Sequence, residues 1–248
     1  MASYLLPNRS FLRLSGPDSE RYLNGQITQK VSETHDNKVL WTGVTNAKGG
    51  LEGVACIRRL SEGEYLLDCP KELGDLLEER LDKYLIADDC EWTREDSEWS
   101  IIVGEELNTE DGKGFDSFRY RNLRKEMLLN ERASNYPNLP ASIENKWCAL
   151  NAVPRWGIEL KTGMLPAEGG LHDLALSFDK GCYIGQEIIS RMKTSGKSRT
   201  RLYQIISKNL EAHSKFTTFY ESEDSNYALQ IDRKVDTTDY PSAMITTY

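Results

Sequence analysis

The sequence predicts an α+β protein, and three observations carry this prediction. Candidate strands and helices are mixed along its 248 residues without regular β–α alternation, which favours antiparallel sheets. Two strand-like segments, 38–45 and 51–60, flank the Gly49-Gly50 pair as the arms of a β-hairpin do. Leucines recur at helical spacing between Leu73 and Leu85, which predicts an amphipathic helix with one face in the core.

The individual elements follow from local signals. Pro17 and Asp18 suit the first turn of a helix that ends at Asn24-Gly25, and Pro70 begins the leucine-rich helix. The polar stretch 105–114 is expected to be a loop or a domain margin. In chain order, the expected strands are 11–14, 38–45, 51–60, 65–68, 99–103, 203–207 and 227–231, and a further helix is expected at 143–153.

Composition limits the class of protein. Hydrophobic residues make up 39% of the chain and charged residues 28%, as in ordinary globular proteins, and no apolar run is long enough to cross a membrane. The net charge of −8 argues against a broadly basic nucleic-acid-binding surface. No export or organelle signal is visible at the N-terminus, and five scattered cysteines favour reduced thiols. We therefore expect a cytoplasmic protein, and a monomer.

The stretch FDKGCYIGQEIISR, residues 178–191, is the first candidate site. Gly181 and Gly185 allow the backbone to approach a ligand closely, and the apolar spacing after Gly185 predicts a helix. Cys182 would then lie just before a helix N-terminus, where the helix dipole and Lys180 would favour a thiolate. Such a thiolate can attack an electrophile, react with an oxidant or bind a soft metal. The alternative is a buried, inert cysteine in a tight turn.

Glu168 is the second candidate, because it lies between Pro166 and the Gly169-Gly170 pair in a loop of defined shape. A carboxylate held in this way can accept two parallel N–H bonds from an aminopyrimidine edge, as in a pterin or guanine. A solvated loop glutamate is the commoner case for any single glutamate.

Two other stretches favour structural roles. The Gly49-Gly50 pair suits a hairpin turn and lacks the spacing of a phosphate-binding loop. The segment 191–201 is rich in basic residues and holds no acidic one, which fits a solvated linker. It also fits a site for a polyanion, such as a glutamate tail or nucleic acid.

The segment KGCYIGQE, residues 180–187, resembles the signature of the YgfZ family, the folate-binding proteins linked to iron–sulfur cluster assembly and repair. That family is related to the T-protein (aminomethyltransferase) of the glycine cleavage system. LSGPDSERYLNGQIT (14–28), TNAKGGLEG (45–53), RWGIEL (155–160) and LPAEGGL (165–171) are similar to further family segments. The resemblance spans about residues 11–201 and is weak between 62 and 141.

This resemblance implies a T-protein-like α+β fold with mixed antiparallel sheets around a central hole for tetrahydrofolate. It implies a folate-binding region at 1–197, with a ferredoxin-like subdomain at roughly 50–140, and a short β-rich C-terminal domain at 198–248, a truncated barrel. Glu168 falls where the T-protein glutamate recognises the pterin ring. Cys182 and Lys180 fall on the motif residues tied to the family's own role. The other expected folate contacts are Tyr183, Gln186, Glu187, Arg191 and Asn46.

One departure from the T-protein pattern bears on activity. T-proteins carry an Asp-Asp pair after the hairpin, and Gly53 and Val54 stand at the corresponding positions, which argues against aminomethyl transfer. We therefore expect a folate-binding accessory protein for iron–sulfur cluster assembly or repair. Its cofactor would be tetrahydrofolate, and its transient partners would be iron–sulfur proteins or assembly factors. The alternatives are a folate-dependent one-carbon transferase and a factor affecting tRNA modification.

Overall fold

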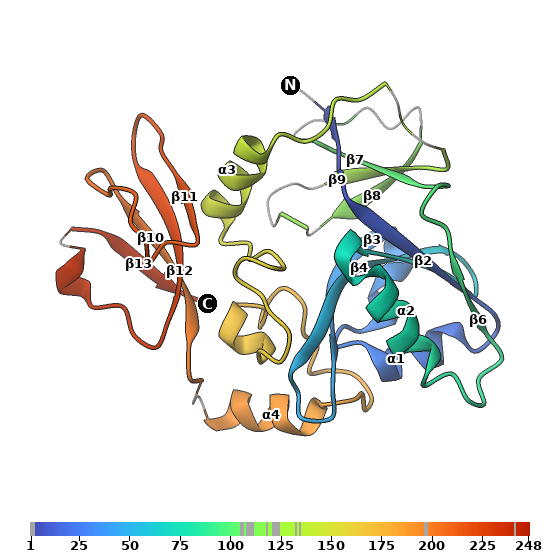
Figure 1. Ribbon diagram of the computed structural model, residues 1–248. Coiled ribbons are helices and arrows are strands. Elements are labelled where there is room, and N and C mark those ends of the chain that lie inside the picture. The colour runs from blue at the N-terminus through green and yellow to red at the C-terminus, as the bar shows by residue number, and fades with distance from the viewer. Residues whose placement is uncertain are drawn as a thin grey trace.

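The computed structural model describes residues 3–104, 107, 112–117, 119–120, 125–131, 133, 135–195, 198–240 and 242–248. Most of the loop expected at 105–114 lies outside these residues, and so does residue 197, where we place the predicted domain boundary. That division into domains stays a prediction. The described residues form two sheets joined by helices and long loops, which confirms the α+β class (Figure 1).

The larger sheet has nine strands among the described residues, in the order β1-β7-β9-β8-β3-β4-β5-β2-β6. All pairs are antiparallel except β3 with β8. The strands are β1 (Ser3–Leu5), β2 (Arg9–Ser15), β3 (Lys38–Thr45), β4 (Leu51–Ser61), β5 (Glu64–Pro70), β6 (Glu91–Arg94), β7 (Ser100–Gly104), β8 (Lys113–Ser117) and β9 (Lys125–Leu129). The β3–β4 hairpin was predicted to within one residue. Strands β1, β6, β8 and β9 were not predicted.

Helices α1 (Ser19–Gln26) and α2 (Gly74–Asp82) follow their predicted positions, although α2 ends three residues before Leu85. Leu77 and Leu81 of α2 are fully buried. A Cβ added at Gly53 of β4 would lie 2.8 Å from Cδ2 of Leu77. Glycine at this position therefore lets α2 lie close to the sheet, and the helix occupies the space that an aspartate would need.

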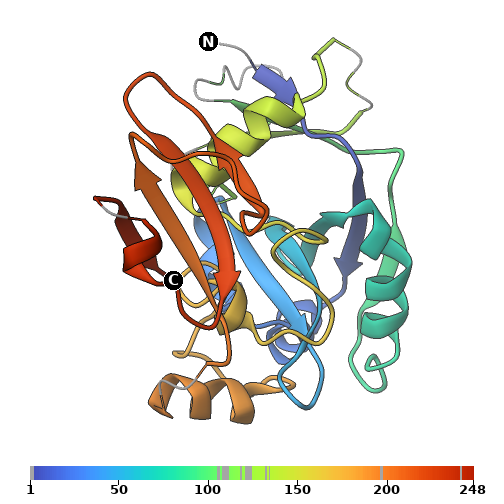
Figure 2. The ribbon, with the colours of Figure 1, turned by 60° about the vertical axis from the view of Figure 1, so that its left-hand side comes forward.

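The smaller sheet consists of β10 (Arg201–Ser207), β11 (Thr218–Tyr220), β12 (Asn226–Asp232) and β13 (Met244–Thr247). Its order is β11-β12-β10-β13, and every pair is antiparallel. Helix α3 (Ala141–Asn151) lies against the β11 side of this sheet (Figure 2). β10 and β12 extend the two predicted strands by one or two residues, whereas β11 and β13 were not predicted.

The segment 152–185 runs between the two sheets and leads into α4 (Gln186–Ser195), at the foot of the molecule in Figure 1. It is tied to β4 by two backbone hydrogen bonds of 2.7 Å, from Leu51 N to Met164 O and from Gly163 N to Leu51 O. The loop that carries Glu168 is thereby fixed beside the β3–β4 hairpin. Among the described residues, no helix combines the length and apolar character needed to cross a bilayer.

Candidate functional site

The signature segment 180–187 is held against the tip of the β3–β4 hairpin. The hydroxyl of Thr45 donates to the carbonyl of Ile184 at 2.6 Å. Gly185 has a φ of +88°, and a Cβ added there would lie 2.5 Å from the carbonyl oxygen of Asn46 and 2.9 Å from Cα of Gly49. Only glycine fits this left-handed, closely packed position. The two motifs that the sequence singled out are therefore one structural unit.

Lys180 anchors the start of the signature. Its ammonium donates to the carbonyls of Ile27 and Gln29 at 2.7 and 2.6 Å, and it lies 4.9 Å from the centre of the Tyr183 ring. Burial lowers the pKa of Lys180 to about 7. The hydrogen bonds of Lys180 thus go to backbone carbonyls after α1.

Tyr183 and Cys182 have opposite environments. Tyr183 is 6% exposed and packs with Leu176, Phe178 and Ile189, whereas Cys182 is exposed. The Tyr183 hydroxyl has no hydrogen-bond partner within the described part of the chain, and burial raises its pKa to about 12. The thiol of Cys182 is accessible to a reagent or a partner, so the alternative of a buried cysteine is wrong.

The remaining predicted residues of the hairpin and signature have local partners. Asn46 accepts hydrogen bonds from the backbone of Lys48 and Gly50 and so shapes the hairpin turn. The side chain of Gln186 accepts from the backbone N–H of Tyr183 at 3.3 Å. Glu187 and Arg191 form an ion pair with each other on the solvent side of α4, at 2.5 Å.

Glu168 lies in a short 3-10 helix, Pro166–Gly169, and is 9% exposed. Its Oε2 accepts the backbone N–H of Leu165 at 2.9 Å and caps its own loop. Its Oε1 accepts no hydrogen bond from the described residues. One carboxylate oxygen of Glu168 therefore shapes the loop.

Two cavities lie near these elements, and none of the eight predicted site residues lines either of them. One, of about 200 Å³, is largely apolar and lies between the loop of Glu168, α4 and the first residue of β10. The basic segment 191–201 contributes Lys193, whose Nζ lies 3.9 Å from the centre of the Phe178 ring. Residues 196 and 197 of that segment lie outside the described residues.

The other, which we call the central cavity, has a volume of about 280 Å³. Its walls come from residues 6–9, the middle of the β3–β4 hairpin, residues 70–72 and 119–120, α3, and residues 153–158. Trp41, Tyr120 and Trp156 give it aromatic surfaces, and Val54 faces it from β4. Of the two positions that correspond to the T-protein aspartates, 53 thus faces α2 and 54 faces the central cavity.

A buried cluster of charges stands behind the central cavity. Asp68 binds Arg9, Arg58 and Arg119, and Glu126 binds Arg58 and Arg119. Burial alone would raise the pKa of Asp68, but the guanidinium groups of Arg119, Arg9 and Arg58 lower it below its ordinary value. Three guanidiniums meet two carboxylates, so the cluster carries one net positive charge. Arg9 and Arg119 bring that charge to the cavity wall.

Comparisons with known proteins agree with the resemblance read from the signature. A Neurospora crassa protein, the iron–sulfur cluster assembly factor IBA57 homolog, mitochondrial, is 23% identical over 230 residues. That alignment covers 81% of this chain and 52% of that protein. A Vibrio vulnificus protein, the tRNA-modifying protein YgfZ, is 24% identical over 229 residues, covering 83% of this chain and 70% of that protein. The chain is a relative of the YgfZ and IBA57 proteins. No protein-family model matches it.

The solved structure of glycine cleavage system aminomethyltransferase T from Bartonella henselae has the same fold. The TM-score is 0.72 at 11% identity, and the match covers 93% of this chain and 78% of that one. The predicted T-protein-like fold is thereby confirmed. The resemblance implied a central hole, but sequence reasoning missed the residues that line the central cavity, because its walls come from seven separate stretches of chain. One available signal was the Arg155-Trp156 pair, which both lines the cavity and belongs to a family-like segment.

Proposed function

We propose that this YgfZ relative binds a reduced folate in the central cavity and supports iron–sulfur cluster assembly or repair. The observation that carries the folate proposal is the chemistry of the cavity wall. Trp41 and Trp156 offer faces for flat rings, and the arginine cluster offers a positive charge to the carboxylates of a glutamate tail. Glu72 and Glu144 offer acceptors to N–H groups. Tetrahydrofolate has flat rings, the carboxylates of a glutamate tail and N–H groups in one molecule.

The residues at positions 53 and 54 of β4 disfavour aminomethyl transfer. Val54 is 1% exposed, and its side chain cannot accept or donate a proton. A carboxylate at position 53 would meet α2. The protein therefore has no aspartate to act on a folate nitrogen from β4, and we propose an accessory role in place of a T-protein-like transferase. An effect on tRNA modification remains the second candidate, because the Vibrio relative is named for it.

Titration with tetrahydrofolate, followed by calorimetry or by quenching of tryptophan fluorescence, is expected to show saturable binding. We also propose that the folate extends beyond the central cavity, which Glu168 does not line, and that Oε1 of Glu168 accepts a donor of the pterin ring. Glu168→Gln should then weaken binding by about tenfold, because an amide is a poorer acceptor than a carboxylate. The glutamine can still accept the N–H of Leu165, so the loop should keep its shape. Glu221→Gln, on the surface of the smaller sheet, is the control. Unchanged affinity in Glu168→Gln would rule out this clamp.

The exposed thiol of Cys182 is proposed as the group through which the protein serves its iron–sulfur partners. In cells that depend on this protein, Cys182→Ser should lower iron–sulfur enzyme activities to the level of cells lacking it. Cys90→Ser, at a half-buried cysteine far from the signature in sequence, should leave them unchanged at matched protein levels. Normal activities in the Cys182→Ser cells would exclude a role for the thiol.

A further inference from the structure

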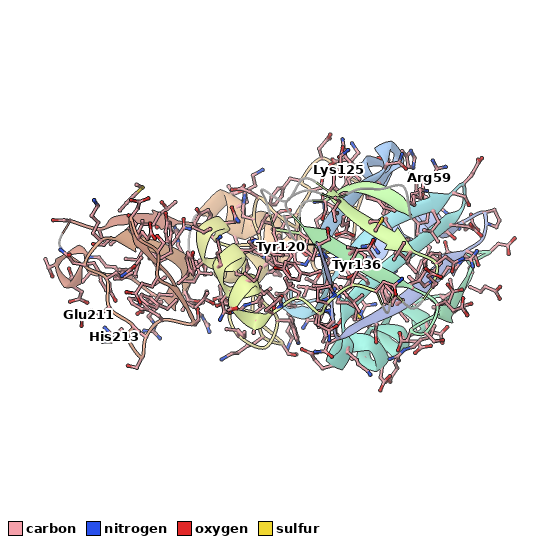
Figure 3. The ribbon with its side chains drawn as sticks, turned by 90° about the horizontal axis from the view of Figure 1, so that it is seen from above. Arg59, Tyr120, Lys125, Tyr136, Glu211 and His213 are labelled. Atoms are coloured by element: carbon pink, nitrogen blue, oxygen red, sulfur yellow. The ribbon has the colours of Figure 1, made fainter. Side chains whose placement is uncertain are left out.

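The smaller of the two cavities, which we call the α4 cavity, lies where the regions of the two sheets meet. Its volume is about 200 Å³, and its walls come from residues between 165 and 178, α4, residue 198, the first residue of β10 and Tyr248. Seen from above, α3 lies between the two sheets (Figure 3), whereas α4 lies at the foot of the molecule in Figure 1. Ligand sites form preferentially at such junctions between parts of a protein.

One face of α4 lines this cavity. Ile189, Met192 and Lys193 have the i, i+3, i+4 spacing that places side chains on one side of a helix, and all three belong to the cavity wall. Ile188 lies on another side of the helix, since a Cβ added at Gly49 of the hairpin would be 3.1 Å from the Cβ of Ile188. Helix α4 is thus packed between the hairpin and the cavity.

The apolar part of the wall is mostly aliphatic, in contrast to the central cavity with its two tryptophans. The Phe178 ring already contacts the His172 ring, at 5.1 Å between centres, and the ammonium of Lys193, at 3.9 Å. The hydroxyl of Tyr248 donates to Gln204 at 3.1 Å. The aliphatic side chains of the wall are those of Leu165, Pro166, Ala167, Leu176, Ile189 and Met192. Such a surface suits a hydrocarbon chain better than a flat heterocycle.

The ionisable side chains that line the α4 cavity, apart from that of Tyr248, are basic. They are His172, Lys193 and Arg201, and no acidic side chain among the described residues lines it. His172 contacts Asp173 at 3.0 Å, outside the wall. The ammonium of Lys193 is exposed and forms no ion pair within the described part of the chain. In a chain with a net charge of −8, a cavity lined by basic groups without a carboxylate side chain favours an anion.

We propose that the α4 cavity binds a short aliphatic carboxylate, with its chain among the aliphatic side chains and its carboxylate at Lys193. The ligand is short because the cavity is smaller than the roughly 300–1,000 Å³ of ordinary ligand pockets. This site is separate from the central cavity, and the inference does not depend on folate binding. Leu176, Phe178 and Ile189 also pack around Tyr183 of the signature. A chain bound in the cavity therefore contacts the side chains that hold Tyr183 in place.

Octanoate and octanamide are the probes, since they share a hydrocarbon chain and differ in charge. Calorimetric titration of the whole protein should show saturable binding of octanoate, with octanamide about fivefold weaker. Lys193→Met keeps the aliphatic stem and removes the charge. It should weaken octanoate binding by about fivefold, as expected for an exposed ion pair, and leave octanamide binding unchanged. Lys234→Met, at an exposed lysine after β12, is the matched control and should bind both probes as wild type does.

Hydrogen exchange locates the bound chain, because octanoate should slow exchange at the amides of Ile189 and Met192 in α4. Protein saturated with tetrahydrofolate should bind octanoate with unchanged affinity. Competition between the two compounds would overturn the inference, since the cavity would then belong to the folate site. Absence of saturable octanoate binding, equal affinity for the two probes, or an equal loss of both in Lys193→Met would also overturn it. Because the octanoate titration needs no folate, it decides the inference independently of the proposed function.

Discussion

Asp68→Asn is expected to lower the free energy of unfolding by about 3–5 kcal/mol, the usual cost of removing one partner from a buried ion cluster. The carboxylate of Asp68 is fully buried and binds three guanidiniums. An asparagine of the same shape would leave Arg58 and Arg119 buried with Glu126 as their one remaining carboxylate partner in the cluster. Urea unfolding followed by circular dichroism measures the effect.

Asp75→Asn is the control, because its side chain is 96% exposed and binds Arg94 on the surface. It should cost less than about 1 kcal/mol. The difference in stability between wild type and Asp68→Asn should also depend on pH. The pKa of Asp68 is lowered in the folded state, so its contribution is present above the ordinary value of 3.8 and is lost as the pH falls below it. A loss below about 1 kcal/mol at pH 7 would contradict the prediction.

Gly185→Ala is expected to cost about 2–4 kcal/mol and to separate the signature from the hairpin. About 1 kcal/mol comes from placing a Cβ at positive φ. The rest comes from the contact itself, since overpacking of this kind costs typically about 1–3 kcal/mol. The new Cβ would lie 2.5 Å from the backbone oxygen of Asn46 in the hairpin. A backbone atom cannot move away by a change of rotamer, as a side-chain atom could.

Gly157→Ala separates these two contributions. Gly157 has a φ of +81°, close to that of Gly185, but an added Cβ would have no neighbour within 4 Å. It should therefore show the backbone cost alone, about 1 kcal/mol. Faster hydrogen exchange at the amides of Gly49 and Ile184 in Gly185→Ala, but not in Gly157→Ala, would locate the damage at the hairpin contact. Equal costs for the two alanines would show that the close approach is not needed.

The elements that the sequence predicted well are those with strong local signals. The β3–β4 hairpin has a glycine pair between two apolar runs, and α2 has leucines at helical spacing after a proline. The unpredicted strands lack such signals. β6 has four residues, none fully buried, and β1, β11 and β13 have three or four. Their pairing is decided by neighbours far away in the chain, as with β1, which joins the sheet through β7.

The same distinction between local signals and contacts of distant segments holds for the candidate site. The signature could be recognised because its residues are consecutive, and its contact with the hairpin explains why both segments carry glycines. The residues that line the central cavity could not be predicted, since Trp41, Tyr120 and Glu144 come together there only when the chain folds. Position 54 shows what the family resemblance and the structure each contribute. The resemblance implied that an aspartate is missing, and the structure shows that valine faces the cavity at that position.

The attachments of the signature also bear on how the protein folds. Lys180 donates to Ile27 and Gln29, 153 and 151 positions upstream, and Thr45 donates to Ile184 across 139 positions. Just before the signature, Thr28 donates to the carbonyl of Ala175 across 147 positions. Contacts so distant along the chain are costly to form early, because a long loop must close first. During synthesis, the hairpin and α1 emerge long before their partner. The surface of the hairpin and α1 that contacts the signature therefore lacks this partner until synthesis has passed residue 187.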